Sequence, residues 1–507
     1  MKHKLTTYYL NFDYKLILII ISLITITVRI ISAFKGGQFF IVDELRYVSG
    51  HHFISFFSDF EFFGGIKYLL NCSAHTLFTL FAGLAEVVRY LFVIIFIDSS
   101  LQPYQLNNST IGIEISAIFL SSASVLNILL IYLVIRSFNG SKLQGLIASV
   151  LLSLSITNFY FSRHLVPYDC SISLSLISFY FAGKSRTSAK YQFLCGIFSC
   201  LSTLTYFGYW PLSFVAWLSC ILRNRTNYFR VALFCGGGGL SPLILIQVIG
   251  FFAGVNYLQN VWDFITATKT NQMGDYFAGF DVFFDYLWKA ESILFYVMLS
   301  LTLLSIFFTN LSSGIFLNHR RIGIFSSVSI LLILFYLSEI EGSFVLYGRT
   351  IKMVIPFTCI ACSYPLFVLM KIHKNQLYSH FILYSFFGLF IISSFNHLNV
   401  LNIVYPNDFK DKAIHISDNF EEVSSLSGVN IRKLEKPNSN SPYCLVNAQW
   451  LVPPLSNTQK SIPNGDILLK ETHPYSSFPP YLFLHYNKEE RQIMQNNKLE
   501  MLLVKKL

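Results

Sequence analysis

The feature that most constrains this chain is a series of long apolar runs, many of them bounded by Lys or Arg. The first run covers residues 16–34 and is followed by Lys35. A helix needs about 20 mostly apolar residues to cross a bilayer, and basic residues collect in cytoplasmic loops. Only 13% of the 507 residues are charged, whereas soluble proteins carry about 25%. The pattern predicts a polytopic α-helical membrane protein.

About eleven transmembrane helices are expected, with the N-terminus in the cytoplasm and the C-terminus outside. They are predicted at residues 16–34, 112–135, 143–160, 168–183, 191–206, 207–222, 231–252, 291–310, 322–338, 351–370 and 380–398. This arrangement puts every later basic cluster on the cytoplasmic side, as the positive-inside rule requires. The first run is too long for a signal-peptide core and has no clear cleavage site, so we expect it to be an uncleaved helix.

One further apolar run, residues 74–97, is predicted not to cross the membrane. It contains His75, Glu86 and Arg89, and its following loop has no Lys or Arg up to residue 110. If this run crossed, the later basic clusters would all change sides. We therefore expect an interfacial amphipathic helix within a first external loop at about 35–110.

The composition changes near residue 399, which divides the chain into two predicted domains. Residues 1–398 form the transmembrane domain, and residues 399–507 are polar and contain many of the prolines. The second part is predicted to be a small extracytoplasmic α/β domain. Its expected elements are strands at 443–450 and 499–505 and a short helix at 488–497.

Charge and cysteine usage exclude several function classes. The net charge of +10 is spread over short loops, which reports topology rather than a nucleic-acid partner. Cys359 and Cys362 lie in an apolar helix without a matching pair, so they are expected to be buried thiols. The adjacent His51 and His52 do not point at one ion in regular structure. The sequence predicts no metal site and no certain cofactor; a divalent metal stays open but nothing indicates one.

Three polar constellations are expected on the outer face. The first is Asp43-Glu44-Leu45-Arg46-Tyr47, directly after the first helix. The second, residues 160–169, contains Arg163 and His164, and the third, residues 347–352, contains Arg349 and Lys352. Together they offer carboxylates and separate arginines at one membrane depth.

This combination suits group transfer from a lipid phosphate. Cations hold the phosphate as negative charge builds on the leaving oxygen, and arginine binds phosphate bidentately without losing its charge. A carboxylate takes the proton from the attacking hydroxyl. At the interface, the lipid tail stays in the bilayer while the headgroup reacts.

These motifs resemble those of the GT-C class of membrane glycosyltransferases, specifically the dolichyl-phosphate-mannose protein mannosyltransferase-like superfamily with its aminoarabinose transferases. The matching features are Asp43-Glu44 with Tyr47, Ser162-Arg163 with Asp169, and Arg349 with Pro356. The resemblance covers roughly residues 10–370. Two departures are the Thr-Ile-Lys that follows the late arginine and the lack of Pro-Pro in the first-loop helix.

The resemblance implies an inverting hexosyltransferase or pentosyltransferase that takes its sugar from a polyprenyl-phosphate donor. Asp43 would be the catalytic base, with Glu44 beside it. Arg163 and Arg349 would bind the donor phosphate. Further donor-binding candidates are Lys352, His164 and Tyr47. A lipid, glycan or protein would be the acceptor in cell-envelope glycosylation, and the expected location is a bacterial inner membrane, with an organelle membrane as the alternative.

Each assignment has a plainer alternative. Asp43 and Glu44 could be a solvated helix end, and Arg163, Arg349 and Lys352 could be interfacial anchors. The aromatic stretch 276–288 is expected to be an interfacial belt, with acceptor binding as the functional alternative. At the level of the whole chain, the alternatives are an envelope polysaccharide polymerase or a polytopic transporter.

Overall fold

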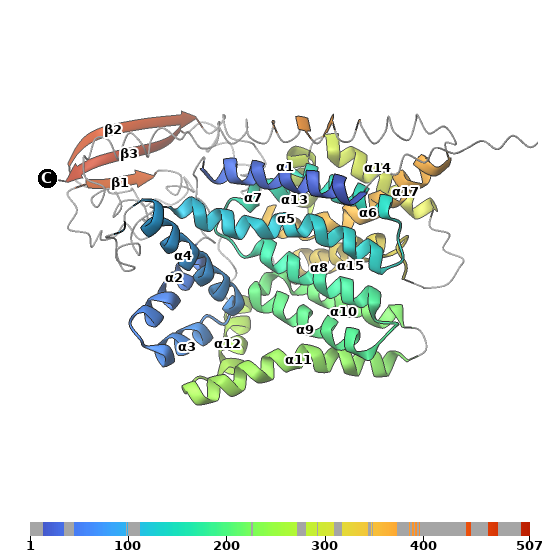
Figure 1. Cartoon of the computed structure of the whole chain (residues 1–507), viewed down its shortest axis with the longest axis horizontal. Helices are drawn as coiled ribbons and strands as arrows, with labels where there is room; N and C mark the ends of the chain where they lie inside the picture. Colours follow the sequence, from blue (N-terminus) through green and yellow to red (C-terminus); the bar gives the residue numbers. More distant parts are fainter. Residues whose placement is uncertain are drawn as a thin grey trace, which may run out of the picture.

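The structure is a computed structural model that shows a stack of helices with a separate small sheet (Figure 1). It describes residues 14–34, 45–97, 112–224, 227–270, 280–291, 293–308, 317–342, 348–372, 443–447, 465–474 and 498–506, with a few isolated positions besides. Asp43 and Glu44 lie outside the described residues, as do nearly all of 380–398 and all of 488–497.

The described residues are mostly helical, and the prediction of an α-helical multi-pass membrane protein is confirmed. Among the residues that the structure describes, five helices are long and apolar enough to cross a bilayer, or up to seven if each of two bent helix pairs counts as one span. The five are α1 (Tyr14–Phe34), α4 (Thr76–Phe96), α5 (Ile113–Ser137), α11 (Tyr228–Ala253) and residues 322–340, which comprise α15 (Ile322–Phe335) and a π-helical turn (Tyr336–Ile340). Eleven spans stay a prediction.

The other predicted spans within the described residues are also helices, but shorter ones. They are α8 (Tyr168–Lys184), α9 (Ala189–Thr205), α10 (Trp210–Arg223), α14 (Ile293–Phe308) and α17 (Ile355–Ile372). The predicted helix at 143–160 is instead the pair α6 (Lys142–Leu154) and α7 (Ile156–Ser162), bent by 62°. The bend therefore sets the direction of α7, which ends directly before Arg163.

Hydrogen bonds tie four basic loops together at one end of the bundle. The backbone N–H of His319 donates to the Phe138 carbonyl at 3.0 Å. Arg186 Nε donates to the Arg223 carbonyl at 2.9 Å, and Arg223 Nη1 donates to the Leu317 carbonyl at 2.5 Å. The loops that the positive-inside rule assigns to one side therefore meet in space.

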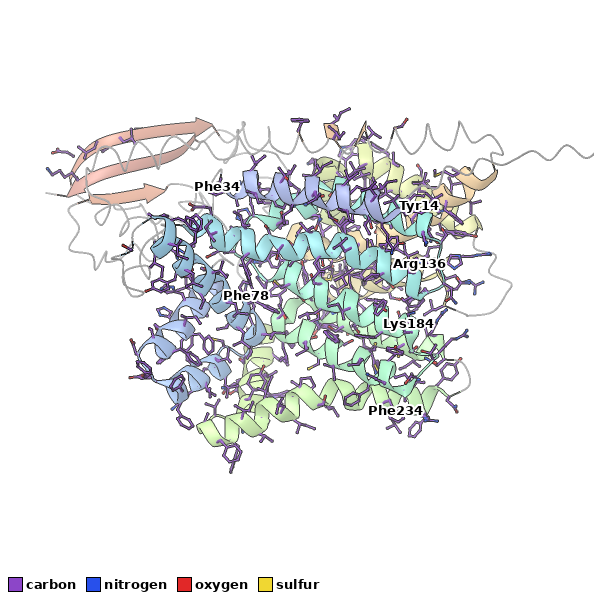
Figure 2. The ribbon with its side chains drawn as sticks, in the orientation of Figure 1. Tyr14, Phe34, Phe78, Arg136, Lys184 and Phe234 are labelled. Atoms are coloured by element: carbon purple, nitrogen blue, oxygen red, sulfur yellow. The ribbon has the colours of Figure 1, made fainter. Side chains whose placement is uncertain are left out.

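The two ends of the bundle are seen in Figure 2. Tyr14, Arg136 and Lys184 lie at one end, whereas Phe34 and Phe78 lie towards the other. Three segments distant in sequence thus share an end in the arrangement that the predicted topology requires.

Three helices gather at the end of the bundle opposite the basic loops. They are α2 (Leu45–Ser58), α3 (Phe62–Asn71) and α4. Gly50 lets α2 approach α4 closely, because a side chain there would overlap Ala82. α4 runs obliquely to the parallel helices α5, α8 and α9 (Figure 1). Its length and composition would allow it to cross a bilayer, so the interfacial placement of residues 74–97 stays a prediction.

Three more short helices lie among the described residues. α12 (Tyr257–Thr270) packs against the start of α4, where the hydroxyls of Tyr257 and Thr76 are 2.9 Å apart. α13 (Asp281–Glu291) precedes α14, and α16 (Gly348–Ile351) precedes α17.

The described C-terminal residues form a three-stranded antiparallel sheet in the order β1-β3-β2. β1 (Tyr443–Asn447) and β3 (Lys498–Lys506) match the two predicted strands, whereas β2 (Gly465–Pro474) was not predicted. The predicted helix at 488–497 lies outside the described residues.

The break between α6 and α7 has a clear cause in hydrogen bonding. Ser155 ends α6 in an extended conformation, and its hydroxyl caps α7 by accepting from the Asn158 N–H. The buried carboxylate of Glu291 accepts from the Ile156 and Thr157 N–H groups at 3.0 Å each and from the Ser155 hydroxyl at 2.8 Å. A carboxylate at a helix N-terminus satisfies free N–H groups and complements the helix dipole. Glu291 therefore sets the direction of α7.

Candidate functional site

A buried ion pair joins the second predicted constellation to the third. Lys352 Nζ lies 2.8 Å from Asp169 Oδ2, and the two side chains are 1% and 5% exposed. Lys352 Nζ also donates to the Asn158 carbonyl of α7 at 3.4 Å. Lys352 follows α16, and Asp169 is in the first turn of α8. Lys352 and Asp169 are 183 residues apart in the sequence. Two distant segments of the chain therefore meet at this ion pair.

The remaining oxygen of Asp169 is held by α5. Asn127 Nδ2 donates to Asp169 Oδ1 at 3.2 Å, and the Ser173 hydroxyl donates to Asn127 Oδ1 at 2.7 Å. This chain of bonds fixes the orientation of the carboxylate, because each member is buried and cannot exchange its partner for water.

Arg29 of α1 brings a second cation to the same carboxylate. It is buried, interacts electrostatically with Asp169, donates from Nη2 to the Ser124 hydroxyl at 3.4 Å, and lies 4.7 Å over the Phe159 ring. Lys352 and Arg29 therefore share Asp169, which leaves the cluster with an excess of positive charge. Buried cations of this kind are costly and mark functional positions in membrane proteins.

Arg163 and His164 follow α7 directly. Both side chains are buried, with 0% and 1% exposed, and both contact Tyr160: the Arg163 guanidinium is 5.8 Å from its ring centre and the His164 ring is 5.2 Å away. Their position depends on the direction of α7 and hence on its cap by Glu291. The prediction that Arg163 would sit in a turn between two helices is confirmed.

Arg349 lies in the one-turn helix α16 and is partly exposed. The hydroxyl of Tyr209 donates to its backbone carbonyl. Tyr209 packs on Tyr168, with ring centres 5.9 Å apart, and on Tyr206, at 5.1 Å. The aromatic cluster thus holds the backbone of Arg349 against the start of α8.

The first constellation reaches this cluster through Arg46. Its guanidinium lies 5.3 Å from the centre of the Tyr206 ring, and Tyr206 contacts Tyr168 at 5.2 Å. Asp43 and Glu44 precede Arg46 by three and two residues in sequence but lie outside the described residues. The structure therefore brings the described members of all three predicted constellations to one end of the bundle.

Tyr47 is buried rather than open to a ligand. It is 1% exposed, and its hydroxyl donates to Glu86 of α4. Burial raises the pKa of Tyr47 well above its ordinary value, with the charge of Glu86 as the next cause. Glu86 also binds His51 Nδ1 at 2.9 Å and Arg89 Nη1 at 3.0 Å. The network anchors α2 to α4 just after the Asp43-Glu44 pair.

Much of this network of hydrogen bonds and ion pairs was not predicted from the sequence. Glu86 and Arg89, three residues apart on a helix, are a visible pairing signal, but nothing in the sequence marks His51 and Tyr47 as their partners. The same holds for Glu291, which looks like an ordinary acidic residue at the start of a membrane helix. Long-range contacts of this kind depend on tertiary packing alone.

His75, the residue before α4, contacts α2. Its Nε2 is 3.3 Å from the Ser49 hydroxyl. Burial, followed by the nearby charge of Arg46, lowers the pKa of His75 to about 3. The imidazole is therefore neutral at physiological pH.

Part of the aromatic stretch 276–288 also reaches the site. Tyr286 of α13 is buried against α16, so that a side chain at Gly348 would come within 2.6 Å of its hydroxyl oxygen. This tyrosine is packed into the protein and is no interfacial anchor. Trp288 is 46% exposed, in keeping with the predicted aromatic belt.

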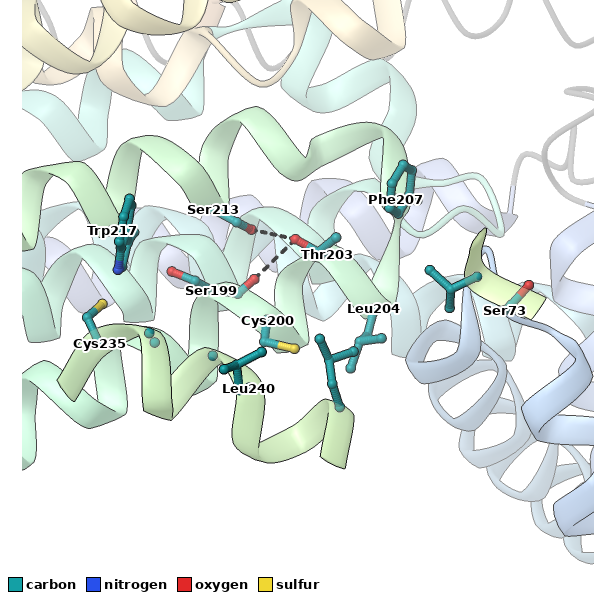
Figure 3. A pocket seen from close by; sticks show the side chains of 15 residues that line it. Ser73, Ser199, Cys200, Thr203, Leu204, Phe207, Ser213, Trp217, Cys235 and Leu240 are labelled. Carbon is teal, nitrogen blue, oxygen red and sulfur yellow. Dashed lines mark hydrogen bonds between the residues drawn. The ribbon is translucent and has the colours of Figure 1, made fainter. Parts of the chain in front are cut away.

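An apolar crevice runs between α9, α10 and α11 (Figure 3). It has a volume of about 430 Å³ and extends from Cys235 to Phe207 and Ser73. In the lining of the crevice, the Thr203 hydroxyl of α9 donates to the Ser213 hydroxyl of α10 at 2.9 Å. Phe207 is the sequence neighbour of Tyr206, so the crevice ends beside the aromatic cluster that contacts Arg46.

The arrangement can bind an anion at the membrane surface, since cationic side chains of four segments gather at this end of the bundle and two of them, Lys352 and Arg29, share the single buried carboxylate of Asp169. The chain matches no protein-family model and no curated protein.

Proposed function

We propose that this membrane protein is a glycosyltransferase of the GT-C type that moves a sugar from a polyprenyl-phosphate donor to an acceptor on the extracytoplasmic face. One observation carries the proposal. Three polar segments from separate parts of the chain converge, and the Lys352–Asp169 ion pair joins two of them directly. Snorkelling anchors would be spread around the bundle and would not share a buried carboxylate.

The proposed reaction is a single inverting displacement. An acceptor hydroxyl oxygen attacks the anomeric carbon of the sugar as the bond from that carbon to the phosphate oxygen breaks. The bonding electrons leave with the polyprenyl phosphate, and the hydroxyl proton passes to the carboxylate of Asp43. Glu44 is the neighbouring carboxylate that orients the base or the acceptor.

Arg163 and Arg349 bind the donor phosphate in this proposal. The partial exposure of Arg349 and its place beside α8 suit contact with a headgroup. Guanidinium groups stabilise the charge that builds on the leaving phosphate. His164 follows Arg163 and would support the same contact.

Lys352 and Tyr47 receive positioning roles. Lys352 is 1% exposed and already bound to Asp169, so it holds the turn that carries Arg163 and adds positive potential. Tyr47 is bound to Glu86 and holds the segment that carries Asp43. Neither side chain needs to touch the donor in order to affect transfer of the sugar.

Two further features support a lipid-linked donor. The apolar crevice beside Tyr206 could receive part of an isoprenoid chain, which has no polar groups to satisfy. The cluster lies at the end of the bundle opposite the basic loops, and those loops face the cytoplasm under the positive-inside rule. We therefore place the reaction on the outer face of a bacterial inner membrane, with residues 399–507 as an extracytoplasmic domain.

The test is transfer by purified protein from a radiolabelled polyprenyl-phosphate sugar to a membrane-extract acceptor. We expect Asp43→Asn to reduce transfer at least 100-fold, the lower end of the range for losing a general base. Arg163→Gln should reduce it by about 100-fold or more, as the loss of one donor to a developing negative charge does. Lys190→Gln, an exposed change at the basic end, is the matched control. Equal rates for folded Asp43→Asn and the unaltered protein would refute the base assignment, and a donor that is never consumed would refute the function.

A further inference from the structure

Three cysteine thiols converge inside the bundle, away from the proposed active site. Cys195 of α9, Cys220 of α10 and Cys235 of α11 are all 0% exposed. Their Sγ atoms all lie within 4.8 Å of one another. No local motif in the sequence marks this group, because its members are 25 and 15 residues apart on three different helices.

Glycine packing explains why the thiols come so close. A side chain at Gly196 would overlap the Cys235 carbonyl, and one at Gly238 would overlap the Phe193 carbonyl. α9 and α11 therefore touch through their backbones on both sides of the thiols. Such close approach requires residues without side chains, and it holds Cys195 and Cys235 on a rigid frame.

We propose that Cys195, Cys220 and Cys235 form a three-coordinate thiolate site for a soft monovalent cation, Cu(I). Thiolate ligands select Cu(I) and other soft metals. Metal–thiolate bonds of about 2.3 Å in a trigonal plane put the sulfurs about 4.0 Å apart. The observed triangle reaches this size with a shift of less than about 1 Å, which side-chain rotation alone supplies.

The number of ligands favours Cu(I) over zinc. Among the described residues, no fourth His, Cys, Asp or Glu joins the group, whereas structural zinc sites have four ligands in a tetrahedron. Ser178 places a hydroxyl beside the group: its oxygen is 3.3 Å from Cys195 Sγ, and it donates to the Cys195 carbonyl at 2.8 Å.

Charge and access also fit. Each thiol that becomes a ligand releases one proton, so the site gains negative charge on binding. Arg223 is three residues after Cys220 on the same face of α10. Arg186 donates to the backbone carbonyl of Arg223. Both arginines lie at the end of the bundle with the basic loops, where Arg223 Nη1 donates to the Leu317 carbonyl. The crevice of Figure 3 reaches Cys235 and Gly196, which provides a path from the membrane to the thiols.

The test is anaerobic titration of the purified full-length protein with Cu(I) against a chromogenic Cu(I) chelator. We expect one high-affinity Cu(I) per chain. Cys195→Ser, Cys220→Ser and Cys235→Ser should each weaken binding by more than the roughly 10–100-fold that follows loss of an outer-shell partner. Cys200→Ser, whose thiol lines the same crevice, and Cys362→Ser are the controls and should bind as the unaltered protein does.

X-ray absorption of the Cu(I)-loaded unaltered protein tests the site without any substitution. Three sulfur neighbours at about 2.3 Å would support it, whereas nitrogen or oxygen neighbours would overturn it. The proposal also fails if the triple serine variant retains the high-affinity site, or if Zn(II) binds there more tightly than Cu(I).

Discussion

Lys352 and Asp169 form an ion pair of 2.8 Å that is closed off from solvent and connects the start of α8 with the turn before α17. Asn127 and the Asn158 carbonyl complete the hydrogen bonding of the two partners. The pair fixes the distance between the turns that carry Arg163 and Arg349. The separation of the two arginines, on which the proposed binding of one phosphate depends, therefore rests on residues that need not touch the phosphate themselves.

Breaking this ion pair from either side should destabilise the protein strongly. Asp169→Asn leaves Lys352 and Arg29 without their shared carboxylate, and Lys352→Met leaves Asp169 with Arg29 as its remaining cation. Removing one partner of a buried pair costs about 3–5 kcal/mol. The double variant should lose less than the sum of the two changes. Thermal unfolding in detergent measures this coupling. Asp285→Asn is the control, because its ion pair with Lys289 is exposed and contributes about 1 kcal/mol or less. Strictly additive losses would show that the pair is not coupled.

Removing the charge of Glu291 should loosen α7. Glu291→Gln replaces a carboxylate that accepts from two N–H groups and one hydroxyl, and the loss of a cap costs about 1–2 kcal/mol. Hydrogen exchange of the Ile156 and Thr157 amides should become faster, and transfer should fall with Arg163 no longer held in place. Glu339 is the control: it is exposed and accepts from the Phe280 N–H, and its change to Gln should leave exchange in α7 as it was. Unchanged protection of both amides in Glu291→Gln would contradict the cap.

The two ends of the bundle should label from opposite sides of the membrane. New cysteines at exposed positions Lys67 and Asn139 can be introduced after replacement of Cys72, Cys200 and Cys444, because the other six cysteines are buried. A membrane-impermeant maleimide should reach Lys67→Cys in intact cells and Asn139→Cys only after permeabilisation. A span at α4 would change the side of Asn139 relative to α1, so labelling at both positions from outside would refute the interfacial placement of residues 74–97.

Stability should fall as the pH drops from about 6.5, and two histidines should account for part of the loss. Burial holds the pKa of His75 at about 3 and that of His319 at about 4. Because both folded values lie below the unfolded value of about 6.5, the folded state binds fewer protons. Its stability is fully present above pH 6.5 and declines as the pH falls towards these values.

His75→Gln and His319→Gln should each reduce the loss of unfolding free energy between pH 7 and pH 4, by about 1–3 kcal/mol. Unfolding temperatures at several pH values measure it. The two residues lie at opposite ends of the bundle, so their effects should add. A slope that neither substitution changes would mean that both imidazoles take up protons without unfolding.

The sequence carried most of the information about which segments are helices. Apolar runs such as 16–34 and 112–135 match α1 and α5 to within a few residues, since a bilayer-length apolar run has few alternatives to a helix. The bend at Ser155 was not predicted, because the apolar pattern continues through it. It depends on the carboxylate of Glu291, which comes from a segment 136 residues away.

Local chemistry alone determined the membrane class, the basic loops and the candidate groups Arg163, Arg349 and Lys352, because hydropathy and charge are properties of each segment by itself. Tertiary structure decided which of these groups act together. It paired Lys352 with Asp169, bound Tyr47 to Glu86 and brought three cysteines into one cluster. The physical reason is that an ion pair, a hydrogen bond or a thiolate triangle exists only at distances of a few ångströms. Such distances between remote residues are set by helix packing, and no local pattern in the sequence records them.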